Sequence, residues 1–317
     1  MLRLTPIAFA ALLFTSCNDS SRPSSGAHPL TVGFSQIGAE SAWRAAETVS
    51  IKAEASRRGV DLKFSDAQQD QGKQIQALRD FIALGVDAVI LAPKVEEGFE
   101  PVLAELKKAG IPVVLVDRGV HVSDPSLYAT LIASDFVDEG RRAAEWLAKH
   151  VDGKANVLEL QGTAGSAPAN DRAKGFRDGI AQHPGITIVR SQSGDFALAK
   201  GKEVTEAALK SMPGGFDVVF AHNDDMALGA IQALEAAGKQ PGKDVIVVSI
   251  DAVAAAFEAM VAGKLDCTVE CNPLMGPAAF DAVEKAVKGE TLPKWIKVED
   301  QVFDRGNAAA AKPNRRY

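Results

Sequence analysis

The stretch FDVVFAHNDDMALGA (216–230) decides the fold class of this chain. A short apolar run leads directly into His222, Asn223, Asp224 and Asp225, and helix-like sequence follows. An unbroken apolar run is typical of a strand buried on both faces, and such a strand followed by a helix is half of a parallel βαβ unit. The polar residues between them have two interpretations that the sequence leaves open: they cap the helix, or they bind a ligand.

The same alternation continues along the chain in both directions. We expect strands in TVGFSQ, DLKFSDA, AVILAP, PVVLVD, NVLELQG, ITIVRSQSG, VVFAHND and VIVVSID. Helical patterns over 41–58, 70–84 and 225–237 separate some of them, and Gly59, Gly85, Gly110 and Gly238 stand where helices should end. This pattern predicts an α/β fold with parallel sheets covered by helices on both faces.

A faint internal duplication predicts two such sheets. GVDAVILAP (85–93) is echoed by GFDVVFAHN (215–223), and GIPVVLVD (110–117) is echoed by GKDVIVVSID (242–251). A chain of 317 residues is also long enough for two domains of ordinary size. We therefore expect two lobes, each a doubly wound parallel sheet.

Composition and motifs exclude several classes of function. A net charge of −6 without a basic tract argues against a nucleic-acid partner. The stretch QGTAGSAPA (161–169) matches neither a dinucleotide fingerprint nor a P-loop, and no G-x-S-x-G elbow occurs. Cysteines and histidines are not spaced for a metal. We expect neither cofactor nor metal, and no catalytic residue.

The N-terminus predicts export. MLRLTPIAFAALLFTSC carries one arginine before an apolar run that is too short to span a bilayer. FTSC is similar to a lipoprotein cleavage box, which makes Cys17 the expected lipidation site, although Phe14 replaces the usual leucine and a soluble mature protein is the alternative. We assign 1–17 to the signal peptide and 18–29, rich in serine, to a flexible tether.

The other two cysteines are expected to be buried, small apolar residues. Cys267 and Cys271 lie four residues apart in LDCTVEC. If this is a strand, they are separated by roughly 13 Å, which is beyond the reach of a disulfide.

Polar side chains gather where the predicted strands end. In open parallel sheets ligands bind beyond the carboxyl ends of the strands, so these ends should converge on one cleft between the lobes. Asp, Asn and Arg together suit an uncharged ligand with many hydroxyl groups, and a tryptophan offers a flat face to a sugar ring. The candidates are Ser35, Gln36, Trp43, Arg44, Asp117, Arg118, Asn223 and Asp251. Arg172 of ANDRAKGF is expected at the start of a helix, and its spacing alone does not favour a ligand role.

Each candidate also has a purely structural interpretation. Asp117 and Arg118 could form a local ion pair, and Asn223 and Asp251 could cap helices. Trp43 could fill the core. Spacing alone does not separate these interpretations from ligand binding.

Long motifs give the chain a family resemblance. LTVGFSQIGAESAWRAAET, DAQQDQGKQIQALRDFIALGVDAVILAP, LVDR, ELQGT, DRAKGF, SQSGDF and AHNDDMALGAIQALEAAGKQPGKD through SIDAV resemble periplasmic sugar-binding proteins of the ribose/galactose type. Within that group they are most similar to galactofuranose-binding proteins of ABC importers. The resemblance extends over nearly all of the mature chain.

The resemblance implies two lobes of the type I periplasmic binding fold, joined by a three-crossing hinge. We place the N-terminal lobe at 30–134 plus 272–296 and the C-terminal lobe at 135–271 plus 297–317. It implies ligand contacts from Trp43, Arg44, Asp117, Arg118, Arg172, Asn223 and Asp251, and adds Glu270 of TVEC.

The expected function is therefore that of a non-enzymatic, exported solute-binding protein. It would capture a monosaccharide, with galactofuranose or a related aldose expected, and deliver it to the permease subunits of an ABC transporter. We expect a monomer in the periplasm that touches the membrane only through a lipid at Cys17. A ligand sensor for a membrane receptor and an exported sugar hydrolase are the alternatives, although no carboxylate pair suited to glycoside hydrolysis is identifiable.

Overall fold

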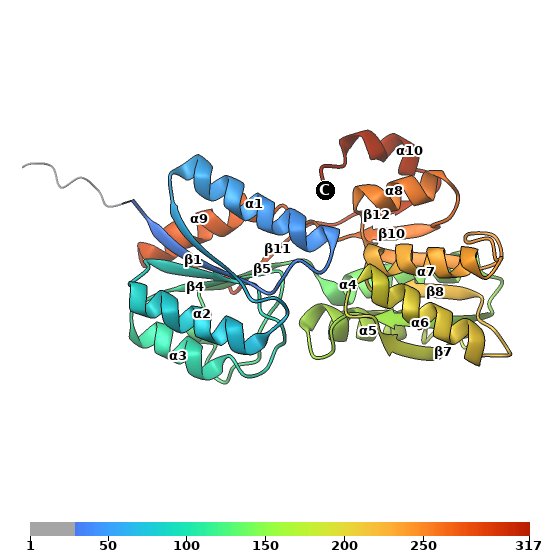
Figure 1. Cartoon of the computed structure of the whole chain (residues 1–317), viewed down its shortest axis with the longest axis horizontal. Coiled ribbons are helices and arrows are strands. Elements are labelled where there is room, and N and C mark those ends of the chain that lie inside the picture. The colour runs from blue at the N-terminus through green and yellow to red at the C-terminus, as the bar shows by residue number, and fades with distance from the viewer. Residues whose placement is uncertain (1–28) are drawn as a thin grey trace, which may run out of the picture.

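The computed structural model describes residues 29–317 and contains two α/β lobes side by side (Figure 1). The expected signal peptide, Cys17 and nearly all of the tether lie outside these residues. The first sheet has the strand order β11-β5-β4-β3-β1-β2 and the second the order β12-β10-β9-β8-β6-β7. Two doubly wound sheets of matching order confirm the predicted fold class.

The first sheet is formed by β1 (Thr31–Gln36), β2 (Asp61–Asp66), β3 (Ala88–Leu91), β4 (Val113–Val116), β5 (Thr130–Ala133) and β11 (Trp295–Lys297). Its helices are α1 (Ala42–Arg58), α2 (Gln71–Leu84), α3 (Glu100–Lys108), α9 (Gly276–Val287) and the short 3-10 helix η1 (Pro125–Leu127). Helices α1 and α9 lie on one face and α2 and α3 on the other (Figure 1).

The second sheet is formed by β6 (Ala155–Gln161), β7 (Ile186–Ser193), β8 (Val218–Ala221), β9 (Ile246–Asp251), β10 (Cys267–Glu270) and β12 (Val302–Asp304). Its helices are α4 (Phe136–His150), α5 (Ala167–Ile180), α6 (Leu198–Ser211), α7 (Asp224–Ala236), α8 (Ala254–Val261), α10 (Ala308–Ala311) and the 3-10 helix η2 (Lys312–Asn314). Strand β12 runs antiparallel to β10, and the other pairings in both sheets are parallel.

The central strands are buried on both faces, as their apolar sequences predict. Every residue of β3, β4 and β8 is buried, because helices cover both sides of each sheet. Strands β3 and β8 occupy equivalent places in the two sheets, and so do β4 and β9. These are the pairs of segments whose sequences echo each other, so the duplication extends to the topology.

The chain passes between the two sheets three times within the described residues. It leaves the first sheet after β5, returns from β10 to α9, and leaves again between β11 and β12. Cys267 begins β10 and Cys271 directly follows it, at the start of the second passage; both are free and buried as predicted. The carboxyl ends of the parallel strands from both lobes therefore face the region near these passages.

Candidate functional site between the lobes

The wall contributed by the first lobe is built around Arg44 in the first turn of α1. Ser41 caps this helix by accepting a hydrogen bond from the Arg44 backbone N–H. The Arg44 guanidinium lies 3.2 Å from Glu40 Oε1, 2.6 Å from Glu47 Oε2 and 2.5 Å from Asp117 Oδ2. Burial lowers the pKa of Arg44, but attraction to these three carboxylates outweighs it and raises the pKa well above its ordinary value.

Arg118 follows directly at the end of β4 and has an unused donor. Asp117 has a φ of 59°, in the left-handed region, and so turns the chain sharply before Arg118. Arg118 donates from Nη1 to the Lys94 carbonyl oxygen over 2.9 Å, whereas its Nε has no hydrogen-bond partner. Burial, and then repulsion by Arg44, lower the pKa of Arg118 to about 10. Its Nε lies 3.4 Å from Asp117 Oδ2, an ion pair without a hydrogen bond. A buried guanidinium with an N–H that makes no hydrogen bond is suited to an incoming oxygen ligand.

The wall contributed by the second lobe centres on Arg172 in α5. Its Nε donates to Glu139 Oε2 of α4 over 2.7 Å, and its Nη1 donates to the His222 carbonyl oxygen over 2.6 Å. Helices α4 and α5 can approach this closely because Gly140 lies against α5, where a Cβ would stand 2.2 Å from the Arg172 carbonyl oxygen. A third neighbour, Asp251 Oδ1, lies 3.7 Å from Arg172 Nη2.

Asn223 caps a helix, as its structural interpretation predicted, and it also lines the cavity. Its Oδ1 accepts from the Met226 N–H over 3.0 Å and so caps α7. Its Nδ2 donates to the Phe196 carbonyl oxygen over 3.0 Å, which leaves a second amide hydrogen. Capping therefore fixes the direction of Asn223 rather than competing with a binding role.

Asp251 ends β9 in an unusual backbone conformation. Its φ is 127°, and the next residue, Ala252, has a φ of 64°. Burial raises the pKa of the Asp251 carboxyl well above its ordinary value, although Arg172 acts in the opposite direction. Strained backbone of this kind persists where the surrounding structure holds it, as it often does at binding sites.

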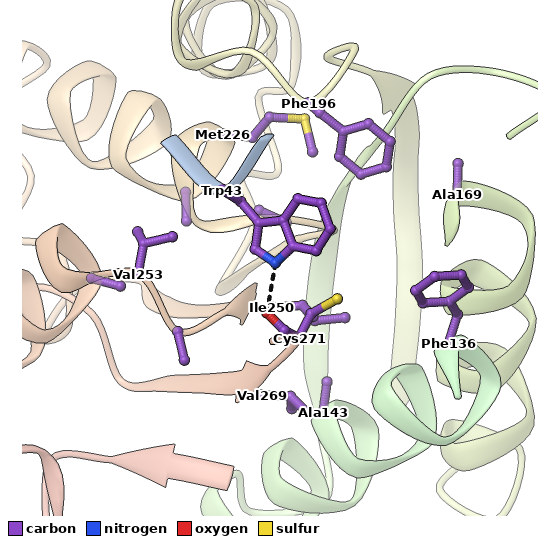
Figure 2. Packing of buried hydrophobic residues seen from close by; sticks show 14 of the residues in the cluster. Trp43, Phe136, Ala143, Ala169, Phe196, Met226, Ile250, Val253, Val269 and Cys271 are labelled. Atoms are coloured by element: carbon purple, nitrogen blue, oxygen red, sulfur yellow. Dashed lines mark hydrogen bonds between the residues drawn. The ribbon is translucent and has the colours of Figure 1, made fainter. Parts of the chain in front are cut away.

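Two aromatic side chains complete the walls. The Phe196 ring lies 5.3 Å from the Arg118 guanidinium and 5.9 Å from that of Arg172, which come from different lobes. Gly162 makes room for this ring, because a Cβ there would stand 1.9 Å from its tip. Trp43 is buried, and Figure 2 shows its indole nitrogen pointing at the carbonyl oxygen of Cys271.

These side chains surround one cavity between the lobes. Its empty space, counted with its opening to solvent, is about 270 Å³. The cavity is therefore suited to a very small ligand. It is lined by Glu40, Ser41, Trp43, Arg44, Asp117, Arg118, Pro168, Arg172, Phe196, Asn223, Asp251 and Cys271.

Seven of the ten candidate residues line this cavity, and three do not. Ser35 and Gln36 are buried beneath it, and Gln36 donates to Glu47 Oε2 over 3.0 Å, so it supports a residue that holds Arg44. Glu270 is buried at the end of β10, where its carboxylate pairs with Arg315. Among the lining residues, Phe196 lacked an assignment from sequence, although its position in SGDF just after a strand was an available signal.

The chemistry of the cavity is that of recognition. Three guanidinium groups, an amide and carboxylates offer hydrogen bonds in both directions, and two aromatic rings offer apolar faces. In residues 29–317 no group of three or more His, Cys, Asp or Glu side chains could hold a metal ion. Over the same residues no helix is long and apolar enough to cross a membrane.

Comparison with known proteins adds independent information. The family model described as periplasmic binding protein domain matches residues 32–291. The galactofuranose-binding protein YtfQ of Escherichia coli K12 is 52% identical over 273 residues, which cover 85% of this chain and 86% of that protein.

Two solved structures are similar throughout. One is the periplasmic binding protein component of the arabinose ABC transporter from Shewanella sp. ANA-3, bound to α- and β-L-arabinofuranose. It is 52% identical with a TM-score of 0.88, covering 90% of this chain and 95% of that one. The other, from Mycobacterium smegmatis in complex with β-D-fucofuranose, is 50% identical with a TM-score of 0.88, covering 90% of this chain and 94% of that one.

Proposed function

We propose that this chain, which belongs to the periplasmic binding protein domain family, captures one small sugar between its lobes and delivers it to an ABC permease. The observation that carries this proposal is the cavity in which Arg118 of the first lobe and Asn223 of the second take part. Like its relatives, the protein is a solute-binding protein and not an enzyme.

A sugar in the furanose form is the ligand that we propose. Among the relatives about 50% identical to this chain, one is named a galactofuranose-binding protein, and two solved structures are bound to L-arabinofuranose and to β-D-fucofuranose. The small cavity, its mixed donors and acceptors and its two aromatic walls are consistent with one five-membered ring carrying several hydroxyl groups. An analogue without one of these hydroxyl groups would leave a buried polar partner unpaired, which gives the site its selectivity.

Ligand capture would work by closing the lobes. Outside the sugar cavity the lobes already touch: the Ala42 N–H donates to Asp225 Oδ2 over 3.2 Å, and Asn170 Nδ2 donates to Glu96 Oε2 over 2.7 Å. A ligand that bonds to both walls stabilises this closed arrangement by its additional contacts there. We propose that the moving parts are 30–134 plus 272–296 and 135–271 plus 297–317, and that the protein is monomeric.

The permease would recognise the two lobe surfaces when they are closed. Transport is the preferred role, because a relative 52% identical to this chain is named as a component of an arabinose ABC transporter. A role as a sensor for a membrane receptor has no comparable support.

We also propose that the protein acts in the periplasm and is held at the membrane through Cys17. The membership of the family supports the compartment, and the sequence FTSC supports the anchor. Replacing the cysteine in a Cys17→Ala variant should move the protein from the membrane fraction to the soluble fraction. Unaltered fractionation would reject the lipid anchor.

Ring form can be tested with labelled sugar. D-galactose carrying ¹³C at C1 contains pyranose and furanose forms in water, whose C1 signals are resolved by NMR. We expect the signal of the bound sugar to be that of the furanose, with calorimetry giving one site per chain. A bound pyranose would reject the furanose assignment, and no binding of D-galactose, D-fucose or L-arabinose would reject the proposed function.

A further inference from the structure

The Glu270 carboxylate does not line the cavity and is bound instead by two residues near the C-terminus, Arg315 and Tyr317. Its Oε1 accepts hydrogen bonds from Arg315 Nη2 over 2.7 Å and from the Tyr317 hydroxyl over 2.8 Å. Both partners belong to 312–317, which we call the tail segment. It follows α10, which lies against α8 (Figure 1). Two donors from one segment thus converge on one buried carboxylate oxygen.

Arg315 is fixed in place by aromatic rings. Its guanidinium lies 5.1 Å from the centre of the Phe257 ring, 5.0 Å from that of Phe303 and 4.7 Å from that of Tyr317. Its side chain is only 10% exposed, so these cation–π contacts are made out of water, where they are strongest. The tail segment is therefore an integral part of the second lobe.

The tail segment also holds the start of α8. The main-chain oxygen of Tyr317 accepts a hydrogen bond over 2.6 Å from the N–H of Ala254, the first residue of that helix. Ala254 comes shortly after Asp251 and Ala252, two consecutive residues with positive φ. One end of the strained turn that presents Asp251 to the cavity is thus tied to the tail segment.

Both attachments lead to residues of the cavity wall. Glu270 is the register partner of Asp251 in the parallel pair β9–β10, and the Cys271 N–H donates to the Asp251 carbonyl oxygen over 3.2 Å. Cys271 in turn accepts the hydrogen bond of Trp43. Asp251 and Cys271 therefore lie next to Glu270 and Ala254. These two neighbours are in turn hydrogen-bonded to the tail segment.

We infer that Arg315 and Tyr317 are positioning residues for the sugar site and act through Glu270 and Ala254. Without Arg315, a carboxylate buried next to the second hinge passage loses its charged partner and has to shift toward water. That shift moves Cys271 and Asp251, whose placement sets the hydrogen bonds available to the sugar. This inference rests on the proposed function, because it concerns how the sugar is held.

The test compares two neighbouring arginines. Arg315→Met removes the partner of Glu270, and Arg316→Met removes the same charge from an exposed position in the same segment. We expect calorimetry to show that R315M binds L-arabinose about tenfold more weakly than the wild type and that R316M binds it equally well. A tenfold loss is typical when a residue that positions a ligand-binding group is removed. Tyr317→Phe should have a smaller effect, and Arg315→Lys should restore part of the affinity.

Affinity, and not stability, decides the outcome. Measurements are made well below the melting temperature on variants whose circular dichroism matches the wild type. If R315M melts earlier but binds L-arabinose within twofold of the wild type, the tail segment only stabilises the fold and the inference is wrong. If neither the wild type nor R316M binds any of the three sugars, the proposed function itself fails and this inference fails with it.

Discussion

Trp43, from the first turn of α1, donates its indole N–H to the carbonyl oxygen of Cys271 over 2.6 Å (Figure 2). Trp43 belongs to the first lobe, and Cys271 is the first residue after β10 of the second lobe, where the chain starts back toward α9. Both residues line the cavity. One hydrogen bond therefore connects an aromatic wall of the site to a passage between the lobes.

Replacing Trp43 by phenylalanine should weaken sugar binding by about fivefold, because the buried carbonyl group of Cys271 loses its donor at a net cost of about 1 kcal/mol. Tryptophan emission should change when sugar binds to the wild type, and this change should be lost in Trp43→Phe. Trp146 is the matched control, since its indole donates to Asp304 away from the cavity. A fluorescence response that persists in W43F but disappears in Trp146→Phe would contradict this role.

Arg118→Met should weaken sugar binding by at least about tenfold, since a hydrogen bond from a charged donor contributes roughly 1.5–3 kcal/mol. The melting temperature should change little, because Asp117 and Glu40 keep Arg44 as a partner. Arg79→Met serves as the control, as Arg79 pairs with Glu105 on the surface of the same lobe. Calorimetry that finds equal affinity in R118M and R79M would remove Arg118 from the site.

Asn223 allows its two roles to be separated. Serine is about as good as asparagine at a helix N-cap, so Asn223→Ser should keep α7 stable but lose the amide that faces the cavity. Asn223→Ala should lose both and cost about 1 kcal/mol of stability in addition. We expect thermal melts to distinguish the two variants while both bind sugar weakly. Wild-type affinity in N223S would show that capping is the whole role of this residue.

Closure should be favoured at lower pH through Asp225. Burial raises the pKa of the Asp225 carboxyl to about 6. The hydrogen bond from Ala42 lowers this pKa, and the nearby charge of Glu40 raises it by a smaller amount. When the lobes open, Asp225 loses Ala42 and returns toward its ordinary value of 3.8. The closed form then binds more protons, so this contribution to closure is complete below about pH 3.8 and is lost as pH rises through about 6.

The expected effect is an affinity that rises by at most about tenfold between pH 7 and pH 5. Asp225→Asn keeps an acceptor for Ala42 but does not titrate, so its affinity should vary less with pH than that of the wild type. Binding isotherms at pH 5, 6 and 7 make this comparison. Parallel pH profiles for the two proteins would exclude Asp225 as the source.

The fold could be predicted from sequence because each signal is local and repeated. Strand-like runs followed by helices, and the echo between 85–93 and 215–223, are sufficient to specify two doubly wound sheets. The strand-end rule located Asp117, Arg118, Asn223 and Asp251, since it depends only on the order of strands and helices. These four residues do line one cavity.

The rest depends on contacts between distant segments. Gln36 is the last residue of its strand, and Arg118 comes two residues after the end of another strand. The Gln36 side chain does not face the cavity, however, because it donates to Glu47, 11 residues away in sequence. Glu270 is taken by Arg315, 45 residues away. Phe196 reaches the cavity because its backbone is left-handed, with a φ of 60°, and because Gly162 makes room. No local pattern encodes such pairings.

The most direct test of the central claim is a crystal structure of the protein grown with D-galactose. We expect density for a single five-membered sugar ring between the lobes, with its hydroxyl groups within hydrogen-bond distance of Arg118 and Asn223. An empty cavity at saturating sugar, or a sugar bound to only one lobe away from these two side chains, would contradict it.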